Sequence, residues 1–177
     1  MNRDIKEAKL LCFSTKNYRW FARLSDETAL ETSIKTYPLF KLPQWCLGMV
    51  VVGGEVSTVI DLEGLFDSNT NQLASDKPLT PNKSILLIKN NYKIALSIQS
   101  LLGLQNTSSF QAYKTNTQIH NPLLSQPFKN DDGDIYYHFD TSVFMPMFEK
   151  VCQTYLSREI TKNVRDKSPH HDINTYQ

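Results

Sequence analysis

The sequence predicts a mainly β fold of small barrels that is closed by a C-terminal helix. Most apolar residues fall in short runs separated by turn-forming residues, which is the spacing of β-hairpins. One long stretch near the C-terminus instead has apolar residues at intervals of three and four, the period of an amphipathic helix. Short strands at hairpin spacing, followed by one substantial helix, are typical of a small-barrel architecture.

The first strands are predicted as a hairpin. Residues 10–13 and 18–24 are short apolar and aromatic runs, and a polar, turn-rich cluster separates them. After this hairpin, Asp26 or the serine before it could cap a brief helical turn that runs through Glu31. Residues 34–40 are expected to be extended, because a residue that precedes proline is pushed toward β geometry.

A second hairpin lies at the centre of the chain. The apolar runs Leu47–Val52 and Val56–Leu62 flank Gly53 and Gly54, which can supply the positive φ angles of a two-residue turn. Short apolar runs usually mean burial, so periodicity alone favours a core hairpin without a function of its own.

The second half of the chain continues this pattern. We expect a short turn or helix at residues 61–66, then a long polar loop through Lys83, and then a third hairpin from residues 84–89 and 92–98. A weak strand is predicted near residues 109–113, a loop at 121–129 and a strand at 135–139. The helix is expected to begin at Thr141, with Pro146 in its first turn. The predicted organisation is therefore an N-terminal arm at 1–9, one domain at 10–157 and a disordered tail at 158–177.

Length and charge limit the possible functions. The chain has 177 residues, enough for one domain or for two small subdomains that share a core. Its net charge of +1 does not indicate nucleic-acid binding. The cysteines Cys12, Cys46 and Cys152 are far apart in apolar surroundings, which favours reduced buried thiols. No apolar run reaches the roughly 18 to 20 residues of a membrane span, so we expect a cytoplasmic protein without membrane insertion.

The sequence contains no catalytic motif, and we predict no enzyme activity, no cofactor and no metal. Phosphate-loop, dinucleotide, nucleophile-elbow and zinc-protease patterns are absent. The aspartates at 131–134 lack the glutamate of a calcium loop, and the adjacent histidines 170 and 171 form only a weak metal-binding pattern. His138 is expected at a half-exposed position in a sheet. Tyr18, Arg19 and Trp20 combine aromatic and basic character, which leaves open a small barrel that binds a ligand or single-stranded nucleic acid.

The central segment resembles the CheW-like domain, the adaptor module of bacterial chemosensory arrays. The family pattern is a proline, four residues, Gly-Val-x-Asn-Leu-Arg-Gly-Glu, an apolar residue, one further residue and Pro-Val-x-Asp-Leu. In the same register this chain has Pro43, Trp45, Gly48, Met49, Gly54, Glu55, Val56, Val59, Asp61 and Leu62. The resemblance extends over roughly residues 10–151. It includes the hairpin at 84–103 and the short acidic segment and late strand at residues 132–140.

The resemblance implies a fold and a role. It implies two intertwined SH3-like subdomains, each a five-stranded β-barrel, with no catalytic activity. Such domains link chemoreceptors to a CheA-type histidine kinase, so the implied partners are this kinase and methyl-accepting receptors, and not nucleic acid. The residues expected to contact partners are Glu31, Gly48, Gly53, Gly54 and Glu55.

This chain also departs from the family pattern. Gly53 stands where the family has the arginine that is associated with receptor contact, and glycine cannot replace its bidentate hydrogen bonds. Thr58 replaces a proline, and Gln99 replaces an aspartate that is common in the later strand. These departures resemble those of divergent adaptors in type IV pilus twitching-motility pathways, and they favour that setting over flagellar chemotaxis.

Overall fold

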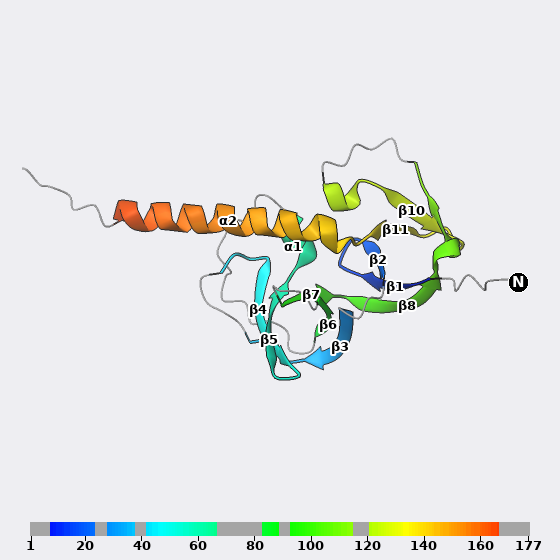
Figure 1. Ribbon diagram of the computed structural model, residues 1–177, viewed down its shortest axis with the longest axis horizontal. Coiled ribbons are helices and arrows are strands. Elements are labelled where there is room, and N and C mark those ends of the chain that lie inside the picture. The colour runs from blue at the N-terminus through cyan, green and yellow to red at the C-terminus, as the bar shows by residue number, and fades with distance from the viewer. Residues whose placement is uncertain are drawn as a thin grey trace, which may run out of the picture.

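The computed structural model describes residues 8–23, 28–37, 42–66, 83–88, 93–114 and 121–166 (Figure 1). Two β-sheets and two α-helices make up most of these residues. The strands are β1 (Lys9–Ser14), β2 (Arg19–Arg23), β3 (Thr28–Ile34), β4 (Cys46–Val52), β5 (Glu55–Ile60), β6 (Lys83–Ile88), β7 (Ile94–Ile98), β8 (Ser100–Asn106), β9 (Phe110–Ala112), β10 (Pro127–Asn130) and β11 (Ile135–His138). The helices are α1 (Leu62–Phe66) and α2 (Thr141–Asp166), with 3-10 turns η1 (Thr107–Ser109) and η2 (Pro122–Leu124).

The strands divide into two sheets, as predicted for two β subdomains, but one sheet has six strands where five were expected. One sheet has five strands in the order β3-β6-β7-β5-β4, and the other has six in the order β8-β1-β2-β11-β10-β9. The chain passes from the first sheet to the second at Gln99, which alone separates β7 from β8. The two subdomains are therefore intertwined, because the strands of the five-stranded sheet lie in the sequence between β2 and β8, which both belong to the six-stranded sheet.

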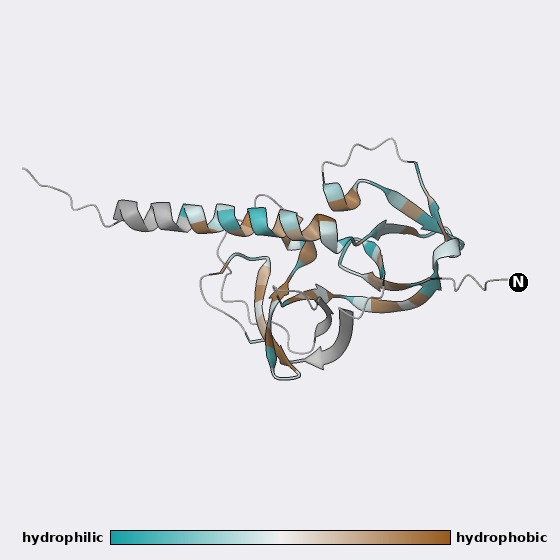
Figure 2. Cartoon of the chain, in the orientation of Figure 1, coloured by the Kyte–Doolittle hydropathy of each residue, from teal (hydrophilic) through white to brown (hydrophobic). Residues whose placement is uncertain are grey.

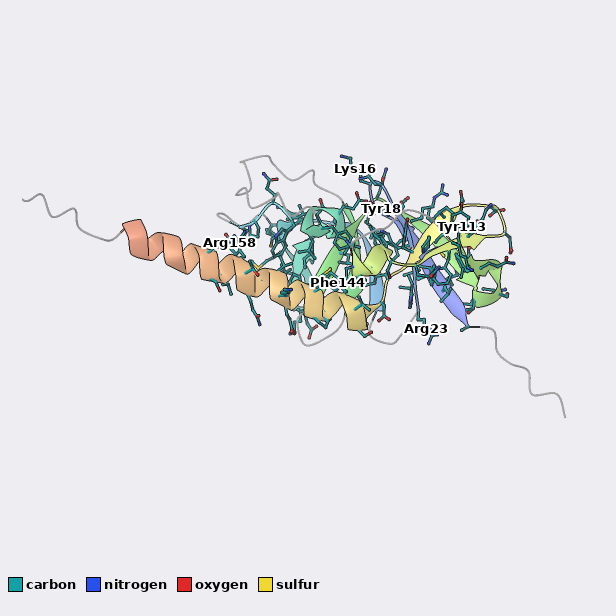
Figure 3. All side chains as sticks on the ribbon, turned by 90° about the horizontal axis from the view of Figure 1, so that it is seen from above. Lys16, Tyr18, Arg23, Tyr113, Phe144 and Arg158 are labelled. Atoms are coloured by element: carbon teal, nitrogen blue, oxygen red, sulfur yellow. The ribbon has the colours of Figure 1, made fainter. Side chains whose placement is uncertain are left out.

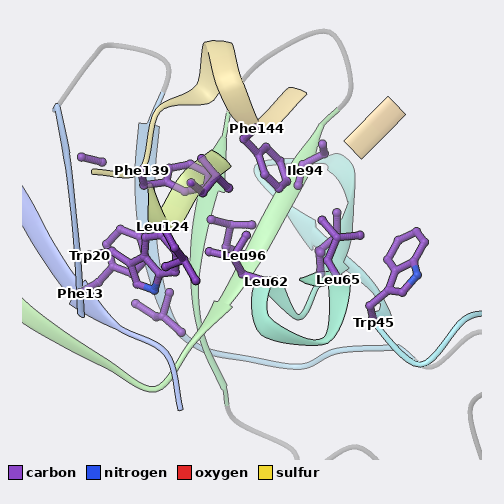
Figure 4. Packing of buried hydrophobic residues seen from close by; sticks show 14 of the residues in the cluster. Phe13, Trp20, Trp45, Leu62, Leu65, Ile94, Leu96, Leu124, Phe139 and Phe144 are labelled. Atoms are coloured by element: carbon purple, nitrogen blue, oxygen red, sulfur yellow. The ribbon is translucent and has the colours of Figure 1, made fainter. Parts of the chain in front are cut away.

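The main hydrophobic core lies between the sheets and is covered by α2. Phe13 and Trp20 enter it from the six-stranded sheet, Ile94 and Leu96 from the five-stranded sheet, and Phe144 from α2 (Figure 4). Each sheet also buries a smaller cluster elsewhere. Val50, Val59 and Ala95 form one, and Leu10, Cys12, Phe21 and Tyr136 form the other.

The helix α2 begins where the sequence predicts it. Asp140 precedes it, and its carboxylate accepts hydrogen bonds from the Ser142 amide at 2.8 Å and the Ser142 hydroxyl at 2.6 Å. These bonds lower the pKa of Asp140, as expected for a carboxylate that caps a helix. Hydrophobic residues dominate the start of α2, and hydrophilic ones its middle (Figure 2). Among the described residues, no helix is long and apolar enough to cross a membrane.

Three local predictions need correction. Residues 28–31, expected in a helical turn, belong to β3, because Leu30 pairs with Leu86 of β6. Residues 127–129, expected in a loop, belong to β10 between β9 and β11, where Pro127 is tolerated as the first residue of the strand. Pro146 lies past the first turn of α2, so the helix lacks one backbone hydrogen bond there.

Of the remaining predicted segments, one helix is longer than expected and several segments lie outside the described residues. The helix α2 continues to Asp166, well into the segment 158–177 that was expected to form a tail. The residues proposed to cap the helical turn, the polar loop at 67–82, the turn at 89–92, His120 and the histidines 170 and 171 lie outside the described residues.

Candidate protein-docking surface

The β4–β5 hairpin has the tight turn that its sequence predicts. Gly53 and Gly54 have φ angles of +57° and +81° and close a two-residue turn in which Val52 pairs with Glu55. Positive φ at both central residues is the geometry that matches the twist of antiparallel strands. A Cβ atom added to either glycine would meet no heavy atom within 4 Å, so the turn is open to its surroundings.

Two valines face each other just behind this turn. Val51 and Val56 are cross-strand partners, and their exposed fractions are 53% and 50%. Tyr37 lies on the same face, since it is bridged to Met49, two residues before Val51, and it is 48% exposed. We call the exposed residues Tyr37, Val51 and Val56 the hairpin face. A cluster of exposed apolar side chains at a rigid turn is typical of a protein contact.

The backbone beside the hairpin face is also available. β4 is an edge strand, and Tyr37 exchanges two backbone hydrogen bonds with Met49, at 2.7 and 2.8 Å. Backbone groups of an antiparallel strand point outward at every second residue, so those of Val51 point the same way as those of Met49. Within the described ranges no strand lies beside Val51. An edge of this kind can accept a strand from another protein.

Among the described residues, the charged groups around the hairpin face are few and interact only weakly with one another. Glu55 and Lys93 form an ion pair at 3.5 Å, and both side chains are more than half exposed, so it contributes little stability. Lys35 lies over the Tyr37 ring at 5.3 Å from its centre. No group of three His, Cys, Asp or Glu side chains that could hold a metal occurs in the part of the chain that the structure describes.

The thiols do not provide a nucleophile. Burial raises the pKa of Cys12 to about 11, and it also raises the pKa values of Cys46 and Cys152. All three thiols are unpaired, as predicted, and they are protonated at neutral pH. The arrangement around the hairpin is suited to binding a protein rather than to acid–base or covalent chemistry.

The predicted partner residues separate into three groups. Gly53, Gly54 and Glu55 lie together at the hairpin tip. Gly48 is in the same hairpin but is buried, with φ of +131° next to the irregularity in the β4–β5 pairing. Glu31 lies in β3, at the other edge of the five-stranded sheet, opposite Ile85 of β6; its side chain is outside the described part.

Sequence reasoning missed Val51, Val56 and Tyr37 as surface residues. The run from Val50 to Val52 has no alternation of polar and apolar residues, so it does not show which side chain faces outward. The two-residue turn was the available signal, because it fixes the register, and register fixes which residues share a face. In the structure Val50 is fully buried and Val51 is exposed.

The rival interpretation rests on Tyr18, Arg19 and Trp20, and its two aromatic residues pack against each other, with Tyr18 half-buried edge to face on Trp20. Trp20 is fully buried, and its indole N–H donates to the Thr15 hydroxyl at 2.9 Å. Phe21 is also buried and stacks on His138, which is half-buried as predicted. A nucleic-acid platform requires exposed aromatic faces, and neither the buried Trp20 nor the half-buried Tyr18 offers an open one.

Comparison with known proteins decides the family. The model of the CheW-like domain family matches residues 31–147, which include the hairpin, strands of both sheets and the start of α2, but not β1 and β2. The chain belongs to the CheW-like domain family. Its fold resembles the crystal structure of the scaffolding protein TtCheW from Thermoanaerobacter tengcongensis, with a TM-score of 0.59 and 14% sequence identity over 80% of this chain and 89% of that chain. No curated protein has a matching sequence.

Family membership agrees with the surface described above. CheW-like scaffold proteins act in chemotaxis signal transduction, and they have no enzymatic activity. CheW-like domains bind CheA and chemoreceptors. The mainly β fold with its C-terminal helix and the non-enzymatic class are therefore confirmed.

Proposed function

We propose that this CheW-like protein couples chemoreceptors to a CheA-type histidine kinase and that the hairpin face docks the kinase. The observation that carries this proposal is the exposed Val51–Val56 pair beside an open strand edge. Removing these side chains from water favours association, and the edge adds backbone hydrogen bonds that fix the register. A scaffold needs this kind of rigid, complementary surface and no reactive group.

The predicted partner residues have different roles in this proposal. Gly53 and Gly54 set the turn that presents the valines, and Glu55 supplies a charge at the rim. Gly48 supports the backbone of β4 from inside and does not touch the partner. Glu31 lies in β3, at the opposite edge of the sheet from β4, so it would contact a different part of the partner.

The receptor contact is proposed to be weaker than the kinase contact. Gly53 lacks the side chain of the arginine found there in the family, so a receptor loses a planar donor of paired hydrogen bonds. This difference supports a role in a divergent pathway. We propose that the protein is cytoplasmic and acts in the pathway that controls type IV pilus twitching motility. Deletion of the chromosomal gene should then impair surface spreading more than swimming.

Kinase docking can be tested with two matched variants. Val51→Lys places a charge in the centre of the hairpin face, and Leu156→Lys makes the same change at an exposed position of α2. With the purified full chain and the host's CheA-type kinase, Val51→Lys should weaken binding by about tenfold or more in biolayer interferometry, as expected at an apolar hot spot. Leu156→Lys should bind as the wild type does. Equal affinity of Val51→Lys and the wild type would contradict the proposal.

A further inference from the structure

A groove of about 730 Å³ lies on the six-stranded sheet, away from the hairpin face. It crosses β8, β1, β2 and β11, which are neighbours in the sheet, next to the turn between β1 and β2. Its volume falls in the range that is usual for ligand sites. Neither the family assignment nor kinase docking gives this groove a role.

Hydrogen bonds hold the walls of the groove in place. The hydroxyl groups of Ser14 and Ser100 are 2.7 Å apart and join β1 to β8. The backbone amide of Asn17 donates to the Glu63 carboxylate at 2.6 Å, and the Asn17 side-chain amide donates to the other oxygen of the same carboxylate. These bonds fix the β1–β2 turn against α1, so the groove is formed before a ligand arrives.

The lining of the groove is rich in hydrogen-bond donors. Lys16, Arg19 and Gln99 line it together with two tyrosines, and no Asp or Glu is among the described residues that do so. Arg19 pairs with Asp134, whereas Lys16 and the Gln99 side-chain amide have no partner within the described ranges. Lys16 and Tyr18 project from the same side of the molecule (Figure 3). This excess of donors is complementary to a carboxylate.

Two further features indicate an extended peptide as the source of that carboxylate. Leu102 and Ile135 add apolar surface, and Leu102 is 38% exposed. β8 carries Ser100 and Leu102, and it pairs with β1 only, among the strands that the structure describes. Its other edge can therefore accept an added strand whose side chains enter the groove.

A nucleic-acid strand fits this groove less well. The rings of Tyr18 and Tyr137 meet edge to face at 5.6 Å, and both are half-buried, so they do not present an open stacking platform. Lys16 and Arg19 are the only cations that line the groove in the described part of the chain, which is too few to follow a phosphate backbone.

We propose that this groove docks an extended acidic segment of a partner protein, with alternating apolar and carboxylate side chains. A carboxylate of the segment pairs with the Lys16 ammonium and accepts from the Gln99 amide, and an apolar side chain rests on Leu102 and Ile135. The segment lies along the free edge of β8. This surface is separate from the hairpin face, so the protein can hold a further partner while it docks a kinase.

The test uses the purified full chain and a fluorescein-labelled peptide of alternating valine and glutamate. Fluorescence anisotropy gives the affinity, and backbone amide chemical shifts locate the site. We expect shifts at residues 14–19 and 99–102 and loss of binding when glutamine replaces glutamate in the peptide. Lys16→Glu should weaken binding about fivefold or more, whereas Lys114→Glu, at an exposed lysine outside the groove, should not.

Each of four results would overturn the proposal. The glutamine peptide could bind as well as the glutamate peptide, or Lys16→Glu could bind as tightly as Lys114→Glu. Succinate at equal concentration could displace the peptide completely, which would indicate a site for a small carboxylate instead. Oligo-dT could bind more tightly than the peptide, which would indicate single-stranded nucleic acid. The native amide spectrum of each variant serves as the folding control, and no kinase is involved in any arm.

Discussion

Trp20 and Val51 both lie in strands, and their surroundings give them opposite roles. The Trp20 indole is enclosed by Tyr18, Tyr137 and Phe139, and its one polar atom is satisfied by Thr15. Such a side chain stabilises the core and cannot contact a partner. Val51 has one apolar neighbour across the strand and otherwise faces outward, so a partner can bury it.

His138 should make the stability of the folded protein depend on pH. Burial lowers the pKa of His138 below its ordinary value of 6.5, although the nearby Asp140 partly opposes this effect. As pH falls below about 6.5, the unfolded chain binds this proton before the folded chain does, so stability decreases until the pH reaches the folded-state pKa. The urea-unfolding free energy should therefore fall between about pH 7 and pH 5.

The matched variant for this prediction is His138→Gln. It removes the titrating group at the same position in β11, and the fall in stability across this window should become smaller. A wild-type free energy that stays constant over the window, or a variant with an unchanged slope, would show that burial of His138 has no part in the pH dependence.

At the scale of elements, the central hairpin was predictable because local and tertiary preferences agree. Gly53 and Gly54 lie between two apolar runs, and the structure uses both glycines at positive φ. β3 was not predictable in the same way, since Ser25 and Asp26 resemble a helix start, but pairing with β6 determines the conformation from Thr28 onward. β10 was not predicted, because the prolines at 122 and 127 favour a loop. The strand is stabilised by its pairing with β9 and β11, and this pairing cannot be inferred from the residues of β10 alone.

The two types of glycine in this hairpin should respond differently to substitution. Gly48→Ala places a side chain at φ of +131° in a buried strand and should lower the unfolding free energy by about 1–3 kcal/mol. Gly53→Asn places a residue that tolerates left-handed geometry in the open turn and should change it by less than about 0.5 kcal/mol. Urea titration followed by circular dichroism measures both values. Similar losses for the two variants would contradict the assigned roles.

For the whole molecule, the core explains how the sheets are coupled to each other. Phe13 and Trp20 from one sheet, Ile94 and Leu96 from the other, and Phe144 of α2 share one hydrophobic cluster. A partner that binds to one sheet therefore contacts a surface that packs, through this shared core, against the other sheet. The groove could not be predicted from the sequence, because it brings together segments that are far apart in the chain, and the position of Tyr37 beside the hairpin also depends on tertiary pairing.

The central claim is that the hairpin face docks the kinase, and hydrogen–deuterium exchange tests it most directly. Exchange at backbone amides would be measured for the full chain with and without the host's CheA-type kinase at saturating concentration. The account predicts slower exchange on kinase binding at residues 49–57, with Val51 among the most protected, and no change along residues 153–158 of α2. Protection that omits the hairpin and falls on α2 or the six-stranded sheet would contradict it.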